Sequence, residues 1–184
     1  MNDLFKIFIF FWIYFVIGRL YELYLTKAHA KVWVDELGSK EVGINSRMMM
    51  ILLHSSWFIA LVVEAYYRAE LTSNLNVGFC FVLLMIAQSL RFHSMKILGP
   101  LWSTRIYYNS HPPLTREGLY RWVRHPNYFA VVLEFVAFPL MFGLWRTMII
   151  FSLLNLVMLY FRTKLEEEVL DEQQAAWRII PKVF

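Results

Sequence analysis

The residues best suited to chemistry lie at positions 118–128, which read Gly-Leu-Tyr-Arg-Trp-Val-Arg-His-Pro-Asn-Tyr. Arg124, His125 and Tyr128 stand there just before an apolar run, and Pro126 suits the first turn of a helix because that position does not use its missing N–H. A guanidinium, an imidazole and a phenol at a helix entrance could bind a charged cofactor. The alternative is an ordinary membrane-interface segment, with aromatic belt residues and anchoring arginines.

A second charged cluster, Arg-Thr-Lys-Leu-Glu-Glu-Glu, occupies positions 162–168. Arg162 and Glu166 are four residues apart and share one face of a helix; alone, they could be an exposed ion pair. The apolar stretch 128–161 is interrupted at 143–146, which predicts a helical hairpin that returns the chain to the side it left. The two clusters are therefore expected within a helix diameter of each other, roughly 10 Å.

Together the two clusters offer complementary halves of one binding site. Carboxylates and aromatic faces attract a cation such as a sulfonium or ammonium group. Arginine forks attract a carboxylate. The sequence therefore indicates a site for a zwitterionic cofactor.

The elements that must position these clusters are membrane helices. The chain has 184 residues, of which 59% are hydrophobic, whereas soluble domains are about 45–50% apolar. A helix crosses a bilayer with about 20 apolar residues. We expect one all-α integral membrane domain, 1–184, with three N-terminal spans in 1–97 and a catalytic region in 98–184. The five expected spans are 4–25, 48–67, 75–98, 128–144 and 147–161.

The basic residues predict the orientation of these spans. Of 18 Lys and Arg residues, thirteen fall after the first, third and fifth spans, three fall on the other side, and two lie within spans. Because basic loops stay in the cytoplasm, we expect the N-terminus outside, and the C-terminus and both clusters on the cytoplasmic side of a bacterial inner membrane.

Several other classes of site lack a signature. The five histidines are scattered without ligand spacing, so no metal site is expected. The seven glycines form no phosphate-binding fingerprint, and nothing indicates nucleic-acid binding. The single cysteine, Cys80, lies in an apolar run and excludes an intrachain disulfide.

The motifs, taken in order, resemble a known family. Gly-x-Tyr-x-x-x-Arg-His-Pro-x-Tyr at 118–128, an apolar hairpin and Arg-x-x-x-Glu-Glu at 162–167 resemble the isoprenylcysteine carboxyl methyltransferases, which are integral membrane enzymes. The segment 98–106 is also similar to the family's stretch after its third core helix. The hairpin, with Glu134 and Pro139, is closest to a bacterial branch thought to O-methylate alkylpyrones.

The resemblance implies S-adenosylmethionine as the methyl donor and a lipophilic acceptor, such as an alkylpyrone or a prenylated acid, in the lipid bilayer. It implies Arg124 as the residue that orients the acceptor oxygen. Glu134, inside the fourth span, is expected to form a wall of the substrate tunnel, or to pair with Arg91 or His93. The residues implied for the cofactor pocket are Leu114, Gly118, Tyr120, His125, Tyr128, Arg162, Glu166 and Glu167.

Two other classes of protein remain open from the sequence. A membrane reductase of the sterol-reductase type would use NADPH in a similar cytoplasmic pocket, although the Glu166–Glu168 run favours a sulfonium over a phosphate. A membrane scaffold or small transporter would not need both clusters on one face, but five spans are compatible with it.

Overall fold

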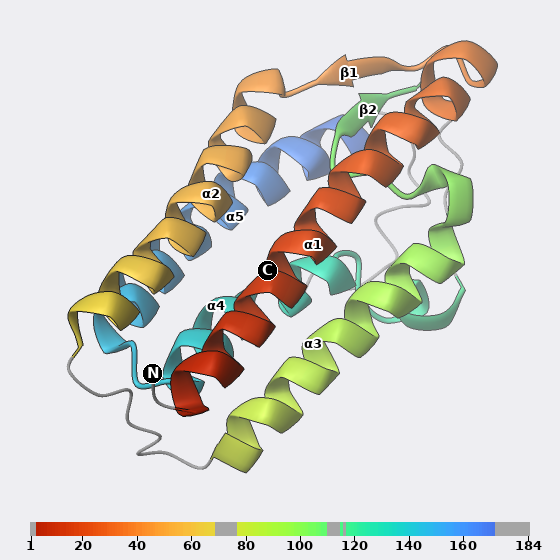
Figure 1. Cartoon of the computed structure of the whole chain (residues 1–184). Helices are drawn as coiled ribbons and strands as arrows, with labels where there is room; N and C mark the ends of the chain where they lie inside the picture. The colour runs from red at the N-terminus through yellow and green to blue at the C-terminus, as the bar shows by residue number, and fades with distance from the viewer. Residues whose placement is uncertain (1–2, 69–76, 110–114, 116, 172–184) are drawn as a thin grey trace.

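The computed structural model describes residues 3–68, 77–109, 115 and 117–171, and these residues are mainly helical (Figure 1). The five helices are α1 (Asp3–Lys31), α2 (Ile44–Tyr67), α3 (Val77–Leu98), α4 (Pro126–Met141) and α5 (Trp145–Asp171). Two short strands, β1 (Lys40–Val42) and β2 (Ile106–Tyr108), pair antiparallel. Short helical turns complete the described elements: η1 (Val32–Glu36), η2 (Gly99–Leu101) and η3 (Gly118–Arg121).

Four of these helices are long and apolar enough to cross a membrane, and α4 is a shorter apolar helix. This confirms the expected all-α membrane fold. The hairpin also forms where it was expected, with a short turn between α4 and α5. However, α5 runs without a break through both the expected fifth span and the charged segment after it, because residues 161–171 contain no glycine or proline to end the helix.

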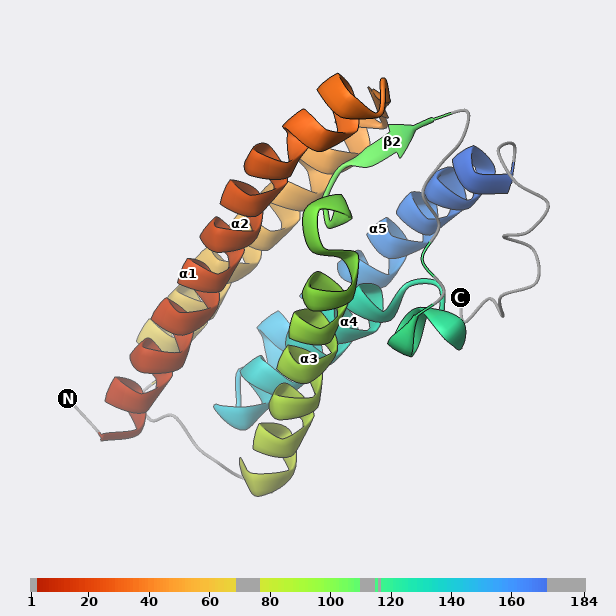
Figure 2. The same cartoon turned by 90° about the vertical axis from the view of Figure 1, so that its right-hand side faces the viewer.

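The helices lie side by side, with α1 and α2 on one side and α3, α4 and α5 on the other (Figure 2). The chain's N-terminal end, the end of α2 and the start of α3 lie at one end of the molecule, and the β1–β2 pair lies at the other (Figure 1). The ends of α1, α3 and α5 also lie near the strand end. The basic segments that follow the first and third expected spans are therefore gathered at that end.

Aromatic side chains from three helices form the centre of the core. Trp57 of α2 stacks on Phe135 of α4, with ring centroids 4.3 Å apart and planes 10° apart. Phe8 of α1 meets Phe142 edge-to-face at 5.3 Å and stacks on Phe138 at 5.9 Å. These five side chains are fully buried, so α1, α2 and α4 are held together by aromatic packing, which is worth more than its buried area alone.

Three buried charges, Glu22, Arg91 and Glu134, and the partly buried Arg19 join α1, α3 and α4. Glu134 accepts hydrogen bonds from Arg91 Nη2 at 2.7 Å, Arg19 Nη2 at 2.5 Å and Gln88 Nε2 at 2.6 Å. Glu22 accepts from Arg91 Nη1 at 2.6 Å and from Arg19 Nη1 at 2.9 Å. Two arginines and two glutamates thus neutralise one another, as ionised groups inside a membrane must.

Residues 101–104 fasten the strand end of α1 to the rest of the molecule. The Thr26 and Thr104 hydroxyls are 3.0 Å apart, and His29 Nδ1 lies 2.8 Å from the Trp102 carbonyl oxygen. Trp33 Nε1 donates to the Leu101 carbonyl at 3.1 Å.

At the opposite end of the molecule, Glu64 of α2 accepts a hydrogen bond from the Thr147 backbone N–H at 2.7 Å. A carboxylate at a helix N-terminus is favourable.

The buried charge cluster generates a stability prediction. Glu134→Ala leaves the buried Arg91 and the partly buried Arg19 with only Glu22 as a carboxylate partner, and breaking a buried pair costs about 3–5 kcal/mol. We expect a large fall in the thermal unfolding midpoint in detergent. Glu168→Ala is the control, because Glu168 is 60% exposed in a loose pair with Lys164. Equal midpoints for the two variants would contradict a structural role for the cluster.

Candidate active site

A chain of hydrogen bonds joins the start of α4 to the end of α5. Arg162 Nε donates to the Tyr128 hydroxyl oxygen at 2.9 Å, and the Tyr128 hydroxyl donates to Glu166 Oε2. Arg162 Nη2 also donates to the Thr104 carbonyl at 2.6 Å. Glu166 and Arg162 share a face because they are one helical turn apart. The predicted meeting of the two clusters thus takes place through Tyr128.

His125 completes this corner. Its ring stacks on Tyr128, with centroids 5.0 Å apart and planes 10° apart. Nδ1 lies 3.9 Å from Glu166 Oε2, and Nε2 lies 3.8 Å from Glu167 Oε1. Arg124 Nη1 is 3.4 Å from the same Glu167 oxygen. The structure therefore brings together five residues that the sequence proposed for the site, together with Arg124.

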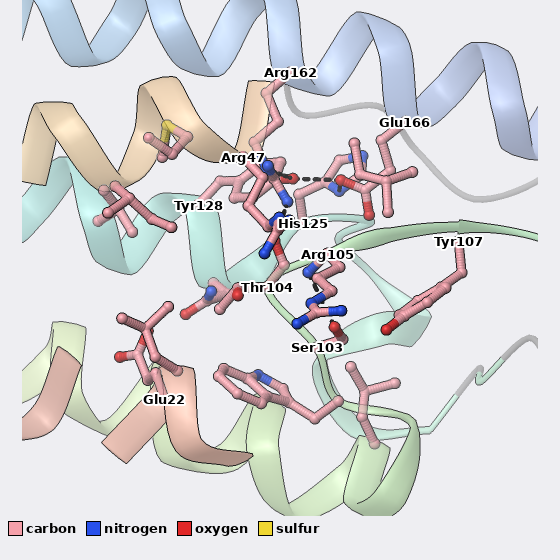
Figure 3. A pocket seen from close by; sticks show the side chains of 18 of the residues that line it. Glu22, Arg47, Ser103, Thr104, Arg105, Tyr107, His125, Tyr128, Arg162 and Glu166 are labelled. Carbon is pink, nitrogen blue, oxygen red and sulfur yellow. Dashed lines mark hydrogen bonds and ion pairs between the residues drawn. The ribbon is translucent and has the colours of Figure 1, made fainter. Parts of the chain in front are cut away.

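These groups, apart from Glu167, line a cavity of about 370 Å³ between the two sides of the helix bundle (Figure 3). Glu167 lies behind them and is not among the described residues that line it. Arg162, Tyr128, His125 and Glu166 gather at one side of it, and Glu22 of α1 lies across from them (Figure 3). Thr104 and Arg105 lie between these two groups. The polar wall is thus built from α4, α5 and the segment before β2.

The walls contributed by α1 and α2 include a patch of apolar side chains, the apolar patch. On each helix the lining residues recur every three or four positions, so they share the one face that is turned toward the cavity. The apolar lining residues on these two helices are Val16, Leu20, Leu23, Met50, Ile51 and Phe58. Polar residues on the same two helices also line the cavity: Arg19, Glu22, Arg47, His54 and Ser55. The cavity therefore has charged groups on both sides, and α1 and α2 add an apolar patch to it.

The strand pair adds cavity residues that sequence reasoning missed. Glu41 of β1 binds two arginines that line the cavity, Arg47 at 2.8 Å and Arg105 at 3.0 Å. Trp33 and Tyr107 also line it and stack at 4.9 Å with planes 7° apart. Strands of three residues leave little periodicity to detect. The only sequence signal for these cavity residues was the group of charged and aromatic residues in the loops that follow the first and third expected spans.

Gly118 shapes the segment that carries Tyr120. Its φ is +53°, a left-handed conformation that favours glycine. A Cβ there would lie 2.3 Å from Ile97 Cδ1 and 2.8 Å from His93 Nε2. Tyr120 then lines the cavity, and burial raises the pKa of its hydroxyl to about 12, against a hydrogen bond with Ser94 that lowers it. Tyr120 is therefore a neutral phenol at physiological pH.

The remaining predicted residues are placed differently. Glu134 is not among the described residues that line the cavity, whereas its partner Arg19 and the second carboxylate of the cluster, Glu22, do line it. Of the two structural alternatives for Glu134, the geometry matches pairing with Arg91. Arg124 lines the cavity and is 3% exposed. Leu114 lies outside the described residues. No group of three or more metal-ligating side chains occurs in the described ranges.

A family model covers the segment that contains these motifs. The model of the isoprenylcysteine carboxyl methyltransferase (ICMT) family matches residues 80–172, which include α3, both motif clusters and the hairpin. The chain belongs to this family. Membership implies a membrane methyltransferase, and it confirms the resemblance drawn from the motifs.

Two relatives extend the similarity toward the N-terminus. The chain is 32% identical over 139 residues to the uncharacterized protein YpbQ of Bacillus subtilis, which covers 76% of this chain and 82% of the relative. It is 25% identical over 154 residues to an uncharacterized protein of Haemophilus influenzae, which covers 83% of this chain and 88% of the relative. No solved structure matches the chain.

The backbone at Gly118 generates a paired prediction. Gly118→Ala places a methyl group against Ile97 and His93 in a conformation that L side chains avoid, so we expect a lower unfolding midpoint in detergent. Gly18→Ala is the control, because a Cβ at Gly18 meets nothing within 4 Å and alanine favours a helix over glycine by about 1 kcal/mol. A Gly118→Ala protein as stable as Gly18→Ala would show that the 118–121 turn is placed wrongly.

Proposed function

We propose that the protein transfers a methyl group from S-adenosylmethionine to an oxygen of a lipophilic acceptor held in the membrane. One observation carries the proposal: the Arg162–Tyr128–Glu166 chain, with His125 stacked on Tyr128, forms one wall of a cavity that also contains an apolar patch on α1 and α2. A charged cofactor and a hydrocarbon acceptor would thus share one space.

The residues present fit a zwitterionic cofactor. Glu166 offers a carboxylate to an ammonium or sulfonium group, and the face of the Tyr128–His125 pair attracts a cation. Arg105 and Arg47 offer guanidinium groups to a carboxylate. The cavity of about 370 Å³ lies within the range of about 300–1,000 Å³ usual for small-molecule sites. When bound, S-adenosylmethionine supplies an electrophilic methyl group on a sulfonium.

The protein's contribution to the rate is alignment. In-line displacement at a methyl group gains about 7–11 kcal/mol when the reacting atoms are well oriented. Arg124 is proposed to orient the acceptor oxygen, since it is buried at the cavity wall beside His125. Glu134 is proposed to act indirectly, by positioning Arg91. Arg91 Nη2 donates a hydrogen bond to Glu134 Oε2, and Arg91 Nη1 donates to Asn127 Oδ1 at 3.2 Å.

The apolar patch on α1 and α2 supports a lipophilic acceptor. The side chains that form it could cover an alkyl or prenyl chain, while the acceptor's head group faces the charged wall. An alkylpyrone or a prenylated acid would fit this division, because each joins one oxygen-bearing head to a long hydrocarbon. An ionised carboxylate needs no base, and an acidic enol needs only a weak one.

The placement of charge also supports the orientation proposed from the sequence. The loops that follow α1 and α3 lie at the strand end of the molecule (Figure 1), and residues 101–107 of the second loop line the cavity. We propose that this end faces the cytosol of a bacterial cell, where S-adenosylmethionine is made, and that the N-terminus lies outside. In this orientation the cofactor reaches the cavity without crossing the bilayer.

Calorimetry of the detergent-solubilised protein with S-adenosylhomocysteine tests the proposed function. We expect saturable binding by the wild type and none by His125→Ala or Glu167→Ala, because each variant removes a member of the charged corner. Glu168→Ala is the control: it is the neighbouring carboxylate, exposed and loosely paired with Lys164, and should bind as the wild type does.

A parallel titration with NADPH makes the test decisive against a reductase. The Glu166 carboxylate and the face of the Tyr128–His125 pair form a wall that suits a cation rather than a nucleotide phosphate, so we expect no saturable NADPH binding. Binding of NADPH without binding of S-adenosylhomocysteine would refute the methyltransferase proposal and favour the reductase.

A further inference from the structure

His54 is a cavity residue that the proposed function does not use. It lies on α2, is half-buried, and lines the cavity together with the apolar side chains of that helix. Its Nδ1 is 2.9 Å from the Met50 carbonyl oxygen, one turn earlier. A carbonyl can only accept, so Nδ1 carries the hydrogen in this contact and Nε2 of the neutral ring presents a lone pair.

That lone pair is buried without a donor. Nε2 of His54 has no hydrogen-bond partner among the described residues. On the α4 side, the ring meets Phe135 edge-to-face at 5.1 Å, a contact that orients the ring but supplies no hydrogen bond. A buried acceptor without a partner is costly in a folded protein, which points to a ligand hydrogen as the missing donor.

The depth of His54 suits a reacting head group. Phe135 lies two helical turns beyond Tyr128 on α4, which is about 10 Å at about 1.5 Å per residue. Val131, one turn from each, lines the cavity between them. His54 is therefore set below the Arg162–Tyr128–Glu166 wall by about 10 Å along the helix axis, beside the apolar patch of α1 and α2 where an acceptor would lie.

The charged groups around His54 are occupied with one another. Arg19 and Glu22 line this side of the cavity and pair at 2.9 Å, and both are linked to Arg91 or Glu134 in the buried cluster. Among the printed ion pairs of the described residues, none joins a carboxylate to His54. The imidazole is thus not committed to a structural ion pair.

We propose that His54 is a further catalytic residue, whose Nε2 accepts the hydrogen of the acceptor's hydroxyl and takes up its proton as the methyl group arrives. The inference rests on the proposed methyl transfer. The methyl C–S bond breaks with its electron pair left on sulfur, a C–O bond forms, and the hydroxyl proton moves to Nε2. The positive charge lost by the sulfonium appears on the imidazole, so the net charge in the cavity is unchanged.

This role has a consequence for acceptor choice. A hydroxyl acceptor satisfies Nε2 with its hydrogen, whereas an ionised carboxylate brings no hydrogen and sets oxygen lone pairs against it. Sites with a buried polar group reject ligands that leave it unpaired. His54 therefore selects an acidic hydroxyl over a carboxylate on the same hydrocarbon chain.

The test compares two acceptor probes of equal chain length, a 4-hydroxy-6-alkyl-2-pyrone and a fatty acid, with methyl-labelled S-adenosylmethionine and the full chain in detergent. We expect the wild type to methylate the pyrone in preference to the fatty acid. His54→Ala should lower kcat for the pyrone by about 100-fold or more, in the range of general base catalysis, while S-adenosylhomocysteine binds within about twofold of wild type. Added imidazole should restore part of the lost rate.

Two further variants separate a chemical role from a structural one. Leu52→Ala, on the same helix but 64% exposed, should retain wild-type turnover. His54→Gln keeps a hydrogen-bond acceptor but cannot take a proton, so its kcat should stay low even where its KM recovers. Three results would overturn the inference about His54 but leave the proposed function standing. They are wild-type turnover in His54→Ala, a preference of the wild type for the fatty acid, and methylation of neither probe by protein that binds S-adenosylhomocysteine. Absence of S-adenosylhomocysteine binding would overturn the proposed function with it.

Discussion

The hydrogen-bond chain from Arg162 through Tyr128 to Glu166 is the interaction on which the candidate site depends. It links the first turn of α4 to the last turns of α5, so the two ends of the hairpin cannot separate without breaking it. Arg162 also holds the Thr104 carbonyl. This chain of hydrogen bonds therefore holds the start of α4, the last turns of α5 and the segment before β2 around one cavity.

The rest of the fold keeps that arrangement in register. The cluster of Arg19, Glu22, Arg91 and Glu134 fixes α1 and α3 against α4 at the depth of the cavity, and the aromatic core fixes α2. Because a membrane offers no water to unpaired charges, these partners are held together by the cost of separating them. The cavity thus has a polar wall on the hairpin, and the two neighbouring helices α1 and α2 add both the apolar patch and the charged side chains of Arg19 and Glu22.

The parts that could be predicted from the sequence were those encoded locally. Apolar runs and their breaks predicted the helices and the hairpin turn, and the hairpin in turn predicted that Tyr128 and Glu166 would meet. The β1–β2 pair could not be predicted, because Glu41 and Tyr107 are far apart in sequence and lie in strands of three residues. The pairing of Arg19 and Glu22 with Arg91 and Glu134 depends on helix rotation, which hydropathy does not define. His54 stands in an apolar stretch with no motif around it, and the role proposed for it depends on a contact that only the structure shows: among the described residues Nδ1 has a partner and Nε2 has none.

A double-mutant cycle between Tyr128→Phe and Glu166→Gln, read out as the dissociation constant for S-adenosylhomocysteine, tests the central claim most directly. If the Tyr128–Glu166 contact organises the cofactor wall, the two changes are coupled by about 0.5–3 kcal/mol, as directly contacting residues are, and the double variant binds little worse than either single variant. Strict additivity of the two effects, or S-adenosylhomocysteine binding that neither change alters, would contradict the account.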